Sequence, residues 1–201
     1  GGGTYDISLI EKTKDIYESI GYTGDSLLGG ANFDSELMNY CIKKFNENSG
    51  VDFIQINADN KALERLKLAC ETSKKILSFQ EEDTIFVQDF KDNKPLNVKI
   101  TRNIFENICQ GLFDKLFAPI DKLLNRYKLT EDAIDEIILV GGSSKIPKLK
   151  EMLQKKFKNV TINDSINPDE SVAYGATIEA EKELRKNNEE LKEFKYIDSI
   201  T

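Results

Sequence analysis

Glycine clusters stand beside two strand-like runs of this sequence, and both suit close contact with a ligand. Gly141-Gly142 follow the run from Glu136 to Val140, and Pro147 then stands where a helix would begin. Gly1-Gly2-Gly3-Thr4 directly precede a second run, Tyr5 to Ile10. Because glycine has no β-carbon, such turns bring backbone amides within reach of a nucleotide. A plain turn is the commoner explanation of either cluster alone.

A second group of chemically useful side chains falls at helical spacing. Glu71, Lys74, Lys75 and Ser78 lie at i, i+3, i+4 and i+7, so they share one helix face. The ordinary explanation is an exposed charged face supported by ion pairs between successive turns. The sequence contains no histidine, which excludes Ser-His-Asp and Cys-His catalysis and any histidine-ligated metal. Chemistry here therefore depends on carboxylates, lysines, hydroxyls, backbone amides or a cofactor.

The composition is that of an ordinary globular protein of one domain, with room for two subdomains. Of its 201 residues 39% are hydrophobic, and a net charge of -7 argues against a nucleic-acid partner. No apolar run approaches the roughly 20 residues that span a bilayer, so we expect a soluble protein without membrane contact. The wide spacing of Cys41, Cys70 and Cys109 fits buried thiols in a reducing compartment such as the cytoplasm, with an organelle lumen as the alternative.

These residues need helices and strands to hold them, and the apolar spacing predicts both. Apolar residues recur every four positions from Phe33 to Phe45 and predict a helix that ends near Gly50. The run from Arg102 to Tyr127 predicts one long helix in which Pro119 is a candidate kink. A glycine-spaced loop is expected over 21–30. Further helical segments are predicted at 60–77, 130–132, 147–157 and 167–180, and strands at 4–10, 16–20, 84–90, 96–101, 137–140 and 160–162.

The order of these elements predicts an α/β fold, a mixed sheet with flanking helices. Residues 30–109 form a helix-helix-strand-strand insert between two glycine-bearing regions. From Glu179 onward the sequence becomes densely charged, which predicts a solvated helix followed by a linker.

Five motifs occur in one order along the chain and are together far more specific than a glycine pair. They are GGGTYD at 1–6, GGANFD at 29–34, ACETSKK at 69–75, VGGSSKIP at 140–147 and NPDESVAYG at 167–175. In this order they resemble the nucleotide-binding domain of the DnaK-like, seventy-kilodalton heat-shock chaperones, over about residues 1 to 186. The resemblance implies an actin-like ATPase fold with two lobes around a nucleotide cleft. This sequence is similar to the second lobe.

The same resemblance implies a division of the chain. Residues 1–29 and 110–188 correspond to the inner subdomain of the lobe, and residues 30–109 to an inserted α+β outer subdomain. Residues 189–201 form an interdomain linker-like tail, more polar than is usual in the family, and such linkers dock as an added strand on a sheet edge. A disordered end is the alternative for this tail.

Site residues follow from the matching motifs. Gly2, Gly3 and Thr4 are expected to offer backbone amides and a hydroxyl to the phosphates of ATP, and three glycines left by cloning are the alternative origin of this segment. Asp6 resembles the aspartate that holds hydrated Mg²⁺ and the attacking water, so Thr4 and Asp6 are the expected catalytic residues. On sequence alone, a solvated strand residue is the better explanation of Asp6.

The adenosine site is expected to lie between two of the motifs. The resemblance implies that Glu71 and Lys74 bind the ribose, Lys75 covers the adenine and Ser78 reaches the edge of the base. On the opposite side it places Gly141, Gly142 and Ser143, with Lys145 facing Lys75 and Asp169 near the ribose or phosphates. Gly30 is also assigned to the nucleotide site.

Two of these positions depart from the family pattern. Lys75 and Lys145 stand where these chaperones typically have arginine. An ammonium group stacks on a flat ring less well than a guanidinium, so adenine binding is expected to be weakened.

The expected function is that of an ATP-driven chaperone, which couples ATP binding and hydrolysis to the capture and release of unfolded client peptides. Nucleotide-exchange factors and J-domain co-chaperones are the expected partners, and the lobe alone is expected to be inactive. A divergent regulatory member, acting as a protein-docking module with a weak or lost ATPase, is the alternative. A sugar or acetate kinase of the same superfamily fits the motif order less well.

Overall fold

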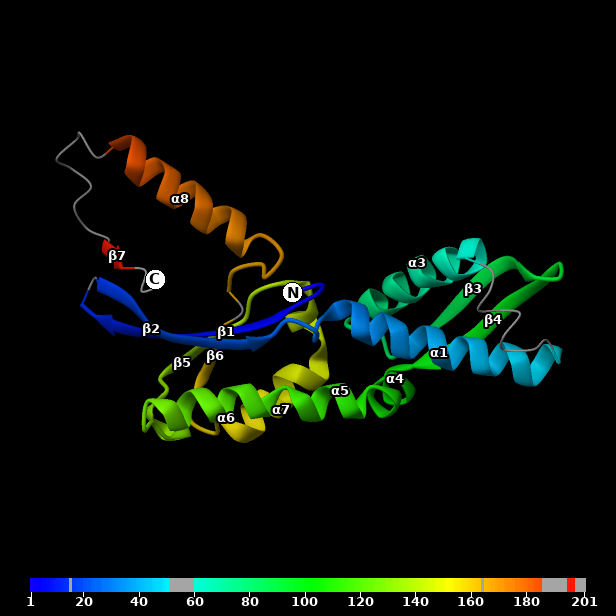
Figure 1. Cartoon of the computed structure of the whole chain (residues 1–201), viewed down its shortest axis with the longest axis horizontal. Helices are drawn as coiled ribbons and strands as arrows, with labels where there is room; N and C mark the ends of the chain where they lie inside the picture. The colour runs from blue at the N-terminus through cyan, green and yellow to red at the C-terminus, as the bar shows by residue number, and fades with distance from the viewer. Residues whose placement is uncertain (15, 51–59, 164, 186–194, 198–201) are drawn as a thin grey trace.

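A long β-hairpin begins the fold of the computed structural model, which describes residues 1–14, 16–50, 60–163, 165–185 and 195–197 (Figure 1). Strand β1 (Tyr5–Thr13) pairs antiparallel with β2 (Ile16–Asp25), with a bulge after Leu9. The hairpin was predicted, but its strands are longer than expected. The predicted loop over 21–30 is wrong in its first half, because residues 21–25 belong to β2. Glycine at position 24 lets the strands meet: a β-carbon there would lie 2.2 Å from the Tyr5 carbonyl oxygen.

The helix-helix-strand-strand segment forms the opposite end of the molecule (Figure 1). Helices α1 (Gly30–Ser49) and α3 (Asn60–Leu77) pack against the antiparallel pair β3 (Glu82–Lys91) and β4 (Lys94–Thr101). The two strands join at Asp92 and Asn93, whose φ angles of 51° and 57° fit the tight turns of hairpins. All four elements confirm the predictions from apolar spacing.

The predicted long helix over 102–127 is broken into three. They are α4 (Arg102–Ile108), α5 (Gln110–Lys115) and α6 (Phe117–Arg126). Pro119 explains the second break, because proline has no N–H and its ring crowds the carbonyl four residues earlier, that of Lys115. The helix ends at that residue instead of kinking at Pro119.

The second half of the chain adds short strands and helices. After a 3₁₀ turn (Glu131–Ala133), β5 (Glu136–Ile138) pairs in parallel with β6 (Thr161–Asn163). A further 3₁₀ helix, η2 (Gly142–Lys145), was not predicted; it precedes α7 (Pro147–Lys156). Helix α8 (Ser171–Arg185) starts four residues later than expected and lies across the hairpin from α6 in Figure 1.

The fold is mixed α/β, as the sequence predicted, and its sheets are small. Among the described residues, strands form one three-stranded sheet and two strand pairs. The three-stranded sheet is mixed, because β7 (Lys195–Ile197) adds in parallel to β2 at Ile16–Glu18. This agrees with the expectation that the tail docks on a sheet edge. The rest of the tail lies outside the described residues.

Two hydrophobic cores stabilise the chain. The larger joins α1, α3, β3 and β4 to α4 and α5, and it includes Leu37, Leu66 and Ile100. The smaller joins α6 to α7 and is completed by Ile7 of β1 and by Ile137 and Ile162 of the short strands β5 and β6. All three cysteines are free and buried, as predicted. No helix within the described ranges has the length and apolarity needed to cross a bilayer.

Tyr5 links the hairpin to the helices by a hydrogen bond, and this contact predicts a loss of folding stability at alkaline pH. Its hydroxyl donates to the Leu116 carbonyl oxygen at 2.9 Å, and burial raises its pKa from 10.0 to about 12. The folded chain therefore favours the neutral hydroxyl. This contribution is complete below about pH 10 and is lost as pH rises through 12.

We expect Tyr5→Phe to lower the free energy of unfolding by about 1 kcal/mol at pH 7. Urea unfolding from pH 7 to 12 measures it, and the difference between wild type and variant should shrink above pH 10. A constant difference across this range would contradict the assignment.

Gly29 ends the connection into α1 and lies against the first residues of the chain. A β-carbon at Gly29 would lie 2.6 Å from the Gly3 carbonyl carbon, and backbone atoms cannot move aside as a side chain can. We expect Gly29→Ala to destabilise the chain by about 1–3 kcal/mol.

Gly175→Ala, within α8, is the matched control, since its β-carbon would meet nothing within 4 Å. It should stabilise by about 0.5–1 kcal/mol through helix propensity. Thermal unfolding of both variants decides the matter; equal effects would show that the contact at Gly29 has no energetic importance.

Candidate functional site

The first residues of the chain are bound by backbone hydrogen bonds to the start of α1. The Gly30 N–H donates to the Gly1 carbonyl oxygen at 3.1 Å, and the Ala31 N–H donates to the Gly2 carbonyl oxygen at 2.8 Å. Both carbonyls therefore point toward α1. A β-carbon at Gly2 or Gly3 would meet nothing within 4 Å, so space beside this segment is open.

The second glycine cluster meets the same segment from the other side. Ser143, on η2, donates its hydroxyl to the Gly1 carbonyl oxygen at 3.2 Å. Gly141 has a φ of 86°, which favours glycine, and its N–H donates to the Pro168 carbonyl oxygen at 2.8 Å. A β-carbon on Gly142 would lie 2.7 Å from the Asp169 Oδ1 atom. The glycines of both clusters thus permit close approaches between segments far apart in the sequence.

Lys74 is not on the exposed face that its spacing suggested. Only about 10% of its side chain is exposed, and its Nζ lies 2.7 Å from Oδ1 of the equally buried Asp34. The same ammonium donates to the Gly30 carbonyl oxygen at 3.1 Å. A β-carbon on Gly30 would lie 2.8 Å from Ser143 Oγ and 3.2 Å from Lys74 Nζ. Glycine at position 30 therefore lets the Ser143 hydroxyl and the Lys74 ammonium both approach the start of α1.

Opposing effects act on the buried carboxyl of Asp34. Burial raises its pKa above the ordinary value, and the hydrogen bond and positive charge of Lys74 partly offset that rise. Burial is the larger effect, as expected for a charge withdrawn from water.

Glu71 and Lys75 follow the ordinary explanation of their spacing. Lys75 Nζ lies 2.7 Å from Glu71 Oε1 one turn away, with 68% of the lysine side chain and 40% of the glutamate exposed. Their hydrogen bond lowers the pKa of Glu71 and raises that of Lys75. Ser78 donates to the Lys74 carbonyl oxygen in the same helix.

Lys145, the second lysine expected beside the adenine, is also paired with an acid. Lys145 donates to the Asp169 carboxylate, which joins η2 to the segment before α8. Both lysines therefore carry an acidic partner within the chain.

The expected catalytic pair lies at the start of β1. The Thr4 hydroxyl donates to Asp6 Oδ2 at 2.6 Å, and both residues are exposed. Within the described part of the chain, no three His, Cys, Asp or Glu side chains group closely enough to hold a metal ion by themselves.

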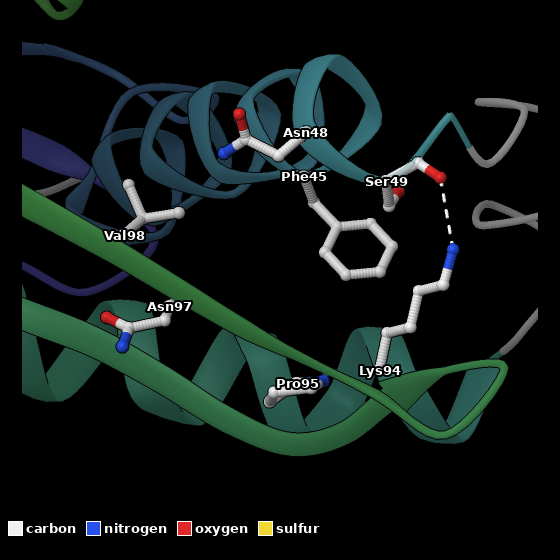
Figure 2. Close-up of a pocket in the computed structure, with 7 residues that line it drawn as sticks. All are labelled: Phe45, Asn48, Ser49, Lys94, Pro95, Asn97 and Val98. Atoms are coloured by element: carbon white, nitrogen blue, oxygen red, sulfur yellow. Dashed lines mark hydrogen bonds between the residues drawn. The ribbon is translucent and has the colours of Figure 1, made fainter.

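Two cavities lie away from these residues. One, of about 250 Å³, lies between the end of α1 and β4 and is lined by Phe45, Pro95 and Val98, with Lys94 bonded to the Ser49 carbonyl oxygen (Figure 2). The other, of about 370 Å³, lies between Phe117 and Met152. Neither cavity is lined by a predicted site residue.

The structure therefore brings Gly1–Gly3, Gly30, Lys74 and Ser143 into one network, and it adds two residues that sequence reasoning did not single out. Gly29 lies in close backbone approach to Gly3. Asp34 is buried among the apolar residues on the core face of α1, one turn after Gly30. In the sequence, the signal for Asp34 is that an acidic residue falls on an otherwise apolar helical stripe.

Comparison of the sequence with known proteins identifies a family. The family model described as Hsp70 protein matches residues 1–201. The chain is 39% identical over 180 residues to "Heat shock cognate 70 kDa protein 3" of Dictyostelium discoideum, with 90% of this chain and 28% of the relative covered. It is 38% identical over the same length to "Heat shock 70 kDa protein" of Trichophyton rubrum, covering 90% of this chain and 27% of that relative.

Another relative, "Heat shock 70 kDa protein" of Neurospora crassa, is 37% identical over 180 residues, with 90% of this chain and 27% of the relative covered. The chain thus spans little more than a quarter of the length of these relatives. By its motifs, its family match and this identity, the chain belongs to the Hsp70 family, whose members are heat-shock chaperones with a nucleotide-binding ATPase domain.

Proposed function

We propose that this chain forms the second lobe of the ATP-binding domain of an ATP-dependent chaperone. The main support for this proposal is a set of hydrogen bonds that joins residues far apart in the sequence: Gly1–Gly3, Gly30, Lys74 and Ser143. The inner subdomain comprises residues 1–29 and 110–188, and the outer subdomain comprises residues 30–109. The two hydrophobic cores support this division in part, because the larger core also includes Leu28, residues of α5 and Ile146 from the inner subdomain.

The residues present fit a bound ATP or ADP. Gly2 and Gly3 border open space, while the carbonyls of Gly1 and Gly2 are engaged by α1, an arrangement suited to offering amides to phosphate oxygens. Thr4 adds a hydroxyl to this group. Asp6 offers a carboxylate of the kind that binds hydrated Mg²⁺, so we assign it a contact with the metal through water. ATP, when bound, supplies the phosphoanhydride bond whose hydrolysis drives the chaperone.

The adenosine side of the site lies between α3 and η2. Glu71 and Lys74 bind the ribose in this proposal, and Lys75 and Ser78 lie along the base. Gly141, Gly142, Ser143, Lys145 and Asp169 form the opposite wall. One of the three N–H donors of Lys74 is engaged by the Gly30 carbonyl oxygen, while Asp34 pairs with its charge, so a donor is left for the ribose.

Client capture and release belong to the whole chaperone. We propose nucleotide-exchange factors and J-domain co-chaperones as partners, unfolded peptides as clients and the cytoplasm as the compartment. Within this assembly the lobe would transmit the state of the nucleotide through its tail, whose β7 pairs with β2.

One observation favours a second function, a protein-docking module with weak or lost ATPase. Lys75 and Lys145 stand where the family typically has arginine, and an ammonium covers a base less well than a guanidinium; each lysine is also paired with an acid of the same chain. Titration of ADP into the full-length protein separates the two functions.

Calorimetric titration of ADP into the full-length protein tests the proposal. Binding, together with phosphate release from ATP, is the expected result. The 201-residue chain alone should release no phosphate, because phosphoryl transfer needs groups on both sides of the nucleotide. Failure of the full-length protein to bind ADP would leave the docking function as the better account. Turnover by the chain alone would overturn the lobe assignment.

A second measurement addresses the lysine pair. Lys75→Arg with Lys145→Arg should tighten ADP binding by about 1 kcal/mol per restored stack, since a guanidinium stacks on adenine better than an ammonium. Lys99→Arg, which alters an exposed lysine paired with Glu82, is the matched control and should leave affinity unchanged. Equal affinities for the double variant and wild type would show that these side chains do not cover the base.

A further inference from the structure

The ion pair between Asp34 and Lys74 is the most buried charged contact among those described here. The two side chains are only 8% and 10% exposed, and their atoms meet at 2.7 Å. Each comes from a different helix, Asp34 from the first turns of α1 and Lys74 from the last turns of α3. The pair therefore joins the two helices beside the nucleotide site.

Energetics argue that this pair serves more than stability. Withdrawing two charges from water costs about as much as their attraction returns, and apolar residues of similar volume commonly stabilise a core equally well. Their neighbours in the core are apolar, including Phe33, Leu37 and Cys70. A buried pair at this position is thus a costly way to hold two helices together, unless the direction of its hydrogen bonds matters.

Lys74 is linked to the segment Gly1–Gly3 through hydrogen bonds of Gly30. Its ammonium donates to the Gly30 carbonyl oxygen, and the Gly30 N–H donates to the Gly1 carbonyl oxygen. Asp34 holds the position of that ammonium by charge, because its Oδ1 lies 2.7 Å from the lysine Nζ. Ser143 reaches the Gly1 carbonyl oxygen independently, so α3, α1 and η2 all bear on one backbone segment.

We propose that Asp34 is a positioning residue that acts through Lys74 and Gly30 to hold Gly1–Gly3 in the geometry that binds phosphate. The inference rests on the proposed nucleotide site and deepens it, since it concerns the phosphates and not the base or ribose. Asp34 itself contacts no ligand. Its effect is a change in how much the phosphates add to binding.

Asp34→Asn tests this, because it keeps the shape of the side chain and removes its charge. The measurement is the dissociation constant of the full-length protein for ADP and for adenosine, which share base and ribose. In wild type the ratio of the adenosine constant to the ADP constant reports the phosphate contribution. We expect this ratio to fall about tenfold in Asp34→Asn, the size of one well-placed polar contact.

Two further variants separate positioning from stability. Ser73→Ala alters a buried side chain on α3, the helix that carries Lys74, and its hydroxyl has no hydrogen-bond partner within the described structure. It should leave the ratio unchanged. Asp34→Asn with Lys74→Met removes the unpaired ammonium and should restore the melting temperature of the ligand-free protein while the ratio stays low. Recovery of the ratio together with the melting temperature would reduce Asp34 to a structural role and overturn the inference.

The outcomes also distinguish this inference from the function on which it rests. If wild type binds ADP more tightly than adenosine and Asp34→Asn keeps the same ratio, only the positioning role is wrong. If wild type binds no ADP, the nucleotide site fails, and the positioning role fails with it.

Discussion

The close approach of two backbone segments, Gly1–Gly3 and Gly29–Gly30, is the constraint on which the rest of this structure depends. Side chains at Gly29 or Gly30 would occupy space taken by Gly3 and by the Ser143 hydroxyl. Two backbone hydrogen bonds then fix the register between the hairpin and α1. Because α1 belongs to the larger core and β1 contributes to the smaller one, this contact sets how the two cores meet.

The buried charge at the same place follows from that constraint. At the start of α1, Lys74 reaches from α3 and donates a further hydrogen bond to the Gly30 carbonyl oxygen, which places its ammonium in the interior. A buried ammonium needs a counter-charge, which explains an acid at position 34 among apolar neighbours. Glycine, lysine and aspartate at these positions therefore form one connected arrangement beside the first residues of the chain.

The sequence predicted the parts of the fold that depend on local spacing. The helix over 60–77 and the hairpin over 84–101 were found as expected, because their apolar residues repeat with the period of one element. It failed where a single residue overrides the apolar periodicity and where a distant contact decides the outcome. Apolar spacing continued through 102–127 although Pro119 breaks the helix, and no local signal told that Lys74 would be buried while Lys75, its neighbour, would be exposed.

Lys75 and Lys145, which we propose lie beside the adenosine, each form an ion pair with an acid of the chain. A surface pair of this kind is worth about 0–1 kcal/mol, so opening Lys75 from Glu71 costs little. Competition from the acids therefore cannot by itself prevent a base from binding. What a lysine lacks is the flat, weakly hydrated surface that a guanidinium presents to a ring. If adenine binds weakly here, the cause lies in stacking, and the paired acids serve mainly to hold two flexible side chains at the rim.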